Sequence, residues 1–151
     1  MIHAAAACGA AFLMAVLWFD LMFDVMALRQ RTGDLPEAVL AAIGAYYRRV
    51  TTEASPMGRI VSVVMLATVA CIGAGLLLTR APPWMGWTSL AAALAAIGLA
   101  IGRTVPHAVR LGRGSDDAAA ATRLARGVLA DHLFCLGAMA TVLLLQLLQV
   151  G

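Results

Sequence analysis

Four long apolar stretches constrain the fold of this chain more than any other feature of its sequence. They cover residues 4–27, 60–78, 84–102 and 127–150, and each is close to the roughly 20 apolar residues that a helix needs to cross a bilayer. Hydrophobic residues make up 62% of the chain and charged residues only 13%, where a soluble domain has roughly a quarter. The sequence therefore predicts an all-α fold, an integral membrane four-helix bundle that forms a single transmembrane domain over residues 1–151.

The arginines give the predicted bundle an orientation. All eleven basic residues are arginines, and all except Arg80 lie in the loop after the first stretch or in the loop before the fourth: Arg29, Arg31, Arg48, Arg49, Arg59, Arg103, Arg110, Arg113, Arg123 and Arg126. Because cytoplasmic loops of membrane proteins are enriched in arginine and lysine, both loops are predicted to be cytoplasmic. We expect a multi-pass protein of the bacterial inner (plasma) membrane, with the N-terminus and the C-terminus outside the cytoplasm.

The expected partner of this chain is the lipid bilayer. The net charge of +3 does not indicate nucleic acid, because no aromatic residues alternate with the arginines on a basic face. Small residues recur every four positions in two of the apolar stretches, at 67, 71 and 75 and again at 98 and 102. Such stripes favour close helix packing, either within the chain or in a homo-oligomer or a larger membrane complex.

The first loop is predicted to contain a helix. Asp34 and Glu37 have the spacing of a capping box, and apolar residues follow at helical intervals from position 39 to position 50. This pattern is typical of a short amphipathic helix on the cytoplasmic membrane surface, and packing against neighbouring protein is an equal alternative. In the third loop Ser115 is expected to cap a helix with Asp116 and Asp117 in its first turn. One long helix is then predicted to run from there through the fourth stretch.

Two aspartates interrupt the first apolar stretch. Asp20 and Asp24 are four residues apart and therefore project from one face of a helix. An ionised aspartate at the centre of a lipid-exposed helix costs about 2.5–3.5 kcal/mol, so such side chains are expected to be paired, hydrated or coordinated. With the predicted orientation they lie at the cytoplasmic depth of four other polar residues, while the opposite half of the bundle has almost none: Arg103, His107, Asp131 and His132.

This convergence supports three interpretations. The first is a cluster in which the aspartates pair with Arg103, Arg110 or the histidines. The second is a metal or redox site, in which four side chains bind iron or another first-row transition metal, with haem less favoured because His107 follows a proline kink: Asp20, Asp24, His107 and His132. The third is a proton or substrate path with Asp20 or Asp24 as the titrating group, which for transport requires an oligomer.

Three short segments resemble the anthrone-oxygenase-like group of small four-helix membrane proteins. The first stretch ends in VMALR at 25–29, the third is followed by VPH at 105–107, and the fourth contains DHLF at 131–134. The resemblance covers nearly the whole chain. It implies a four-helix membrane fold and, for the activity, an oxygenase reaction.

Together these observations give a functional hypothesis with two alternatives. We expect a small inner-membrane protein with a polar pocket near the cytoplasmic face, acting like an oxidoreductase on a lipophilic substrate. The alternatives are a non-catalytic structural or assembly subunit of a larger membrane complex and a proton-coupled transporter that works as an oligomer, so catalysis itself is left open. The candidate catalytic residues are Asp20, Asp24 and His132, and the candidate binding residues are Arg103, His107 and Asp131.

Overall fold

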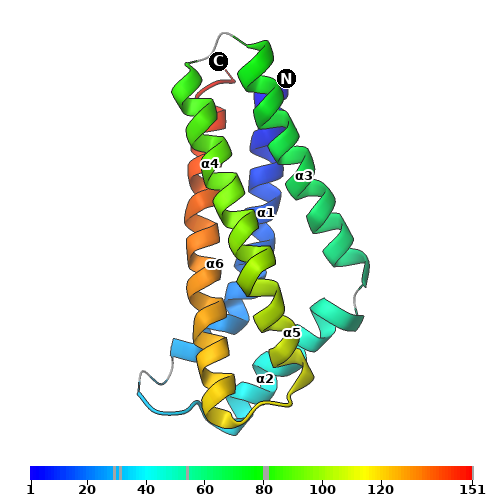
Figure 1. The fold of residues 1–151 in the computed structure, drawn as a ribbon, viewed down its shortest axis with the longest axis vertical. Helices are drawn as coiled ribbons and strands as arrows, with labels where there is room; N and C mark the ends of the chain where they lie inside the picture. The colour runs from blue at the N-terminus through cyan, green and yellow to red at the C-terminus, as the bar shows by residue number, and fades with distance from the viewer. Residues whose placement is uncertain (29, 31, 54, 80–81, 151) are drawn as a thin grey trace. The chain divides into compact units, whose positions relative to one another are not determined.

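The computed structural model describes residues 1–151 except positions 29, 31, 54, 80, 81 and 151. It is 89% helical, and the described residues form no strand, which confirms the all-α prediction. In chain order the elements are α1 (Ile2–Asp24), the 3₁₀ turn η1 (Val25–Leu28), α2 (Glu37–Arg48), the π-helical turn η2 (Arg49–Glu53), α3 (Ser55–Leu78), α4 (Pro83–Leu99), the π-helical turn η3 (Ala100–Thr104), α5 (Val105–Arg113) and α6 (Ala118–Leu147) (Figure 1).

Four helical segments are long and apolar enough to cross a membrane, as the sequence predicts. They are Ile2–Leu28, Pro56–Leu78, Pro83–Arg113 and Ala118–Leu147. Their apolar side chains are largely exposed on the chain, including the large ones of α1 and α3: Trp18, Phe19, Met22, Val63, Leu66, Leu77 and Leu78. An apolar surface of this extent needs a cover other than water, and lipid provides one.

The third segment is longer than predicted. The helix passes from α4 through η3 into α5 and ends only at Arg113, so it continues past Pro106 and His107. Proline lacks an N–H group, and Pro106 stands in the first turn of α5, directly after the π-helical turn. That position tolerates the missing hydrogen bond. The helix ends where Gly114 adopts a left-handed backbone with φ of 63°.

Both predicted helix caps are wrong by a few residues. In α2 the N-cap is Pro36, and no side chain caps the helix, so Asp34 has no capping role. In α6 the backbone N–H of Ala120 donates to Asp117 Oδ1 over 2.7 Å, so Asp117 caps the helix in place of Ser115. The helix itself is confirmed: α6 continues without a break for 30 residues, from the third loop through the fourth apolar stretch.

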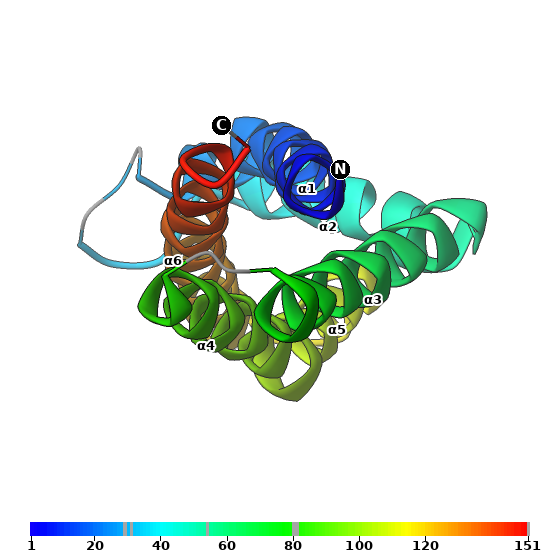
Figure 2. The same ribbon diagram turned by 90° about the horizontal axis from the view of Figure 1, so that it is seen from above.

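The chain divides into two compact units, each built from segments far apart in sequence. Unit 1 consists of residues 1–17, 60–98 and 134–151, and unit 2 of residues 18–59 and 99–133. In unit 1 the first part of α1, the helices α3 and α4, and the last part of α6 surround a common centre (Figure 2). The buried residues there are mainly small, which lets helices approach closely: Ala6, Ala7, Ala10, Leu13, Ile72, Ala93, Ala96, Met139 and Val142.

The two predicted small-residue stripes differ in what they do. Gly75 lies against the ring of His3, where an added Cβ would come within 2.9 Å of Cε1. By contrast, a Cβ added to Gly98 or Gly102 would meet no other heavy atom within 4 Å in the described structure. The second stripe therefore has no packing role within the described chain.

In unit 2 the amphipathic helix α2 packs against α5 (Figure 1). A Cβ added to Gly44 would lie 3.0 Å from the carbonyl oxygen of Leu111, and one added to Gly112 would lie 2.8 Å from the backbone nitrogen of Arg48. The apolar face of α2, with Ile43 and Tyr47, is buried. Of the two alternatives for this helix, packing against protein is the one that its apolar face adopts.

Candidate functional site

The centre of the candidate site is a buried contact between Asp24 and His132. His132 Nδ1 lies 2.6 Å from Asp24 Oδ2, in hydrogen-bonding and ion-pairing distance. The second oxygen of the same carboxylate, Oδ1, accepts a hydrogen bond of 2.5 Å from the hydroxyl of Tyr47. Asp24 is 1% exposed, so both of its oxygens have a protein partner in place of water.

Asp20 repeats this arrangement one helical turn away. Its Oδ1 accepts a hydrogen bond of 2.5 Å from the hydroxyl of Tyr46, and its Oδ2 lies 3.9 Å from His132 Nε2. The ring of Tyr46 is stacked on Phe23, with 4.1 Å between the ring centres. Unlike Asp24, the Asp20 side chain is partly exposed, at 18%. Asp20 is therefore the open end of the cluster.

The local sequence explains this geometry. Residues four apart in α1 are separated by about 6 Å along the helix axis on one face, so the two carboxylates lie one above the other. Two consecutive tyrosines of α2 each reach one carboxylate, while the imidazole of α6 has one ring nitrogen toward each of them. We call these five residues the Asp–His group: Asp20, Asp24, Tyr46, Tyr47 and His132.

Asp131 belongs to a separate pairing in the same unit. It is 1% exposed and forms an ion pair with Arg103, whose Nε donates to Asp131 Oδ2 over 2.9 Å and whose second contact goes to Oδ1. Thr104 Oγ1 donates to Asp131 Oδ2 over 3.1 Å. As adjacent residues of one helix, Asp131 and His132 point in different directions. Arg103 therefore binds a carboxylate, but that of Asp131, and Arg110 pairs with Asp116.

His107 does not join this arrangement. It is half-buried in α5 near Gly127, and its Nδ1 is buried without a hydrogen-bond partner within the described residues. Nor does the described part of the chain contain a group of three or more His, Cys, Asp or Glu side chains placed to hold a metal ion. Of the four predicted metal ligands, Asp20, Asp24 and His132 lie together, and His107 forms no hydrogen bond or ion pair with them in the described structure.

The two tyrosines are held in their protonated form. Burial, followed by the hydrogen bond to Asp20, raises the pKa of Tyr46 well above its ordinary value. Burial, followed by repulsion from the charge of Asp24 and by the hydrogen bond to it, raises the pKa of Tyr47 still further. Both hydroxyls therefore remain hydrogen-bond donors to the carboxylates over the whole physiological pH range.

Three sets of polar residues in the structure are not among the candidates that the sequence predicts. Tyr46 and Tyr47 fall within the apolar pattern of residues 39–50, and Thr104 lies directly after Arg103. A pair of adjacent tyrosines on a loop helix directly after a span with two aspartates is a signal that was available, because the tyrosine hydroxyl is a good partner for a buried carboxylate. The third set lies around His3 in unit 1. The sequence predicts almost no polar residues in the half of the bundle to which His3 belongs.

Comparison with protein-family models, curated proteins and solved structures finds no match to this chain. The resemblance to the anthrone-oxygenase-like group therefore stays a prediction.

Proposed function

We propose that this chain is a multi-pass membrane protein whose Asp–His group exchanges a proton with the ionisable hydroxyl of a lipophilic substrate. In this proposal the four apolar helical segments form a bundle in the bacterial inner membrane, with both termini outside the cytoplasm. The observation that supports it best is the imidazole of His132, which has a carboxylate at each of its ring nitrogens.

The arrangement has the elements of a proton relay. When both carboxylates are ionised and His132 is protonated, the three groups have a net charge of −1, and one further proton makes them neutral. Burial favours the smaller net charge, so uptake of a proton at Asp20 is compensated electrostatically. After a proton is taken up at Asp20, the proton on His132 Nδ1 can pass to Asp24 across the 2.6 Å contact, which leaves two neutral carboxylic acids and a neutral ring with its proton on Nε2.

The tyrosines position the two carboxylates for this transfer. Each hydroxyl donates to one carboxylate oxygen and leaves the other oxygen directed to the imidazole. Since their pKa values are raised, the tyrosines act as fixed donors and do not compete for the proton. Tyr46 and Tyr47 are thus positioning residues.

The surroundings of Asp20 support a lipophilic and aromatic substrate. Large apolar side chains next to Asp20 on α1 are exposed, including Trp18, Phe19 and Met22. A molecule dissolved in the lipid would reach the partly exposed carboxylate along this surface. Its hydroxyl would then donate to Asp20, in the manner of a phenol or a hydroquinone.

A binding experiment with a defined probe tests this proposal. The probe is a short-chain hydroquinone, and the reporter is the fluorescence of Trp18 in a variant with Trp84→Phe and Trp87→Phe, which leaves a single tryptophan. We expect saturable quenching, weakened about 10-fold or more in Asp20→Asn, the effect of losing one hydrogen bond to a charged group. Asp34→Asn, at an exposed loop position, is the matched control.

Infrared difference spectra of the same samples separate binding from proton transfer. Probe binding is expected to produce the carbonyl band of a protonated carboxylic acid in the wild-type chain, and this band is expected to change in both Asp20→Asn and Asp24→Asn. Quenching that is identical in wild type and Asp20→Asn contradicts the proposal. A chain that binds no hydroquinone and co-purifies stoichiometrically with other membrane subunits favours the structural alternative.

A further inference from the structure

Unit 1 contains a second buried polar group, which the proposed function does not use. It consists of four side chains, one each from α1, from the residue that follows α3, from α4 and from α6. We call them the His3 group: His3, Thr79, Ser89 and Gln146. Ser89 and Gln146 are at most 1% exposed, and His3 is 8% exposed. Polar side chains in apolar helices are expensive unless they are hydrogen-bonded, so their arrangement requires an explanation.

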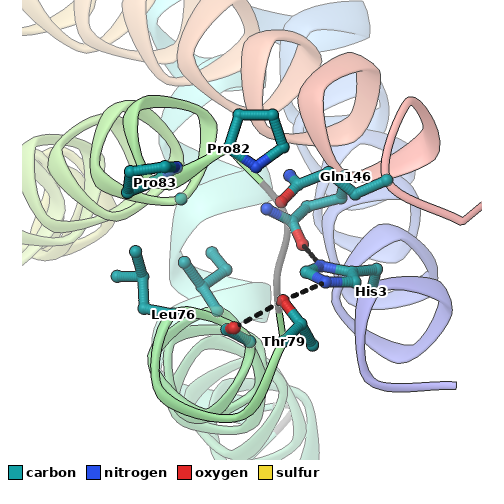
Figure 3. Close-up of a pocket in the computed structure, with 10 residues that line it drawn as sticks. His3, Leu76, Thr79, Pro82, Pro83 and Gln146 are labelled. Carbon is teal, nitrogen blue, oxygen red and sulfur yellow. Dashed lines mark hydrogen bonds between the residues drawn. The ribbon is translucent and has the colours of Figure 1, made fainter.

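The four side chains form one hydrogen-bonded chain. His3 Nδ1 lies 3.0 Å from Gln146 Oε1, and His3 Nε2 lies 3.2 Å from Thr79 Oγ1 (Figure 3). The Gln146 amide nitrogen donates to Ser89 Oγ over 3.0 Å. At the other end, the Thr79 hydroxyl donates its single hydrogen to the carbonyl oxygen of Gly75 over 2.8 Å.

For the orientation of the Gln146 amide described above, the number of available hydrogen atoms determines the charge of His3. The Thr79 hydroxyl has already used its hydrogen, so it accepts from Nε2–H of His3. Gln146 Oε1 has no hydrogen, so it accepts from Nδ1–H. With this orientation of the Gln146 amide both ring nitrogens carry a proton, which makes His3 an imidazolium cation.

A second arrangement satisfies the same groups with one proton fewer. If the Gln146 amide turns by half a rotation, its nitrogen donates to an unprotonated Nδ1 and its oxygen accepts from the hydroxyl of Ser89. Nε2–H still donates to Thr79. No hydrogen bond of the chain is lost, so the neutral and the charged His3 are both compatible with the same positions of the heavy atoms.

We propose that His3 is a proton-binding site whose charge sets the orientation of the Gln146 amide and of the Ser89 hydroxyl. Uptake of one proton at Nδ1 turns the amide oxygen toward His3 and makes Ser89 an acceptor, and loss of that proton reverses both. The group thus has two states with different dipole directions. The His3 group shares no residue with the Asp–His group and belongs to the other unit. A result that contradicts one of the two proposals therefore leaves the other unaffected.

A small cavity gives this site access to water. It has a volume of about 10 Å³ and is lined by His3, Thr79 and Gln146 together with apolar and glutamine side chains, among them Leu76, Pro82, Pro83 and Gln149 (Figure 3). That volume is about the size of one water molecule, which can exchange a proton with the ring. Among the described residues that line the cavity His3 is the only titratable one, and the amino group of Met1 lies two residues away on its own segment.

Nuclear magnetic resonance of the whole chain in detergent micelles tests the proposal. Glutamine occurs only at positions 30, 146 and 149, so labelling glutamine and histidine side chains with ¹⁵N gives a spectrum that can be assigned by single substitutions. In a pH titration we expect the His3 ring to exchange between the imidazolium and the Nε2–H tautomer. The Gln146 amide signals are expected to shift on the same curve, and those of Gln149, whose amide donates to Leu145, to remain in place.

Ser89→Ala removes the group that must reverse with the amide, and Thr88→Ala, at the exposed neighbouring position, is its matched control. We expect the coupled Gln146 shift to be lost in Ser89→Ala and kept in Thr88→Ala. The wild-type titration decides the question even if Ser89→Ala does not fold. A His3 ring that keeps one protonation state at all pH values, a neutral ring in the Nδ1–H form, or a Gln146 signal that ignores the His3 titration overturns the proposal.

Discussion

At the scale of single residues, the Asp–His group solves the problem of two carboxylates in an apolar helix. Asp24 loses nearly all contact with water, and the hydroxyl of Tyr47 and the ring of His132 replace it. Asp20 remains partly exposed to solvent. The hydroxyl of Tyr46 donates a hydrogen bond to it over 2.5 Å. The two aspartates therefore differ in how much they depend on their protein partners.

This difference predicts unequal effects of two matched substitutions. Tyr47→Phe leaves a buried carboxylate oxygen without a donor and is expected to lower the free energy of unfolding by about 1–3 kcal/mol. Tyr46→Phe is expected to have a smaller effect, because water can reach Asp20 and replace the hydroxyl. Unfolding in detergent with increasing denaturant measures both. An effect of Tyr46→Phe that equals or exceeds that of Tyr47→Phe would show that the exposure of Asp20 has no energetic role.

The tyrosines also predict a pH dependence. The chain has only two tyrosines, so the ultraviolet absorbance of tyrosinate reports on Tyr46 and Tyr47 alone. Since their pKa values are raised in the folded state, their contribution to stability is fully present below the unfolded value of about 10 and is lost as the pH rises above it. We expect the folded chain to show no tyrosinate near pH 10 and the denatured chain to show about half of its full tyrosinate signal. The prediction is wrong if the folded chain already shows half of the signal at that pH.

At the scale of elements, the close packing of α2 on α5 is what brings the tyrosines to the carboxylates. Gly44 and Gly112 allow the two helix backbones to touch, at distances that a Cβ atom would not permit. Arg48, whose backbone meets Gly112, directly follows Tyr47. The position of the helix α2 and the hydrogen bond to Asp24 are therefore coupled.

We predict that Gly112→Ala weakens both. The added Cβ would meet backbone atoms of Tyr47 and Arg48 at 2.8–3.1 Å, and backbone cannot move aside as a flexible side chain can. Overpacking of this kind lowers the free energy of unfolding by about 1–3 kcal/mol. Gly98→Ala, where an added Cβ meets nothing, is the control and is expected to be neutral or to stabilise by up to about 1 kcal/mol. Equal unfolding curves for Gly112→Ala and wild type would contradict this account.

At the scale of the whole molecule, the exposed apolar side chains and the arginine-rich loops together support the proposed insertion into a bilayer. Each of the four candidate spans exposes large apolar residues, and each of the two units holds buried polar side chains that are hydrogen-bonded to one another. Both features are those of a protein whose surroundings are lipid and whose few polar residues pair internally. The orientation rests on the distribution of the arginines.

Cysteine labelling in intact bacterial cells tests that orientation. In a background in which Cys8, Cys71 and Cys135 are replaced by alanine, single cysteines are introduced as Asp34→Cys, Arg113→Cys or Trp84→Cys, all at exposed positions. A membrane-impermeant maleimide is expected to label only Trp84→Cys until the cells are permeabilised. Labelling of Arg113→Cys in intact cells would reverse the topology and place the Asp–His group near the outer face.

The presence of the four long helices and the common face of Asp20 and Asp24 could be predicted from the sequence, because apolar runs and helical spacing are local properties of the chain. Because Asp131 and His132 are adjacent in a helix, they point to different partners. Which partners these are depends on the tertiary structure. His132 meets Asp24 across 108 positions and His3 meets Gln146 across 143, and contacts at such separations depend on how whole helices pack. For the same reason His107, although predicted beside the aspartates, lies outside their group, while two tyrosines from a loop helix belong to it.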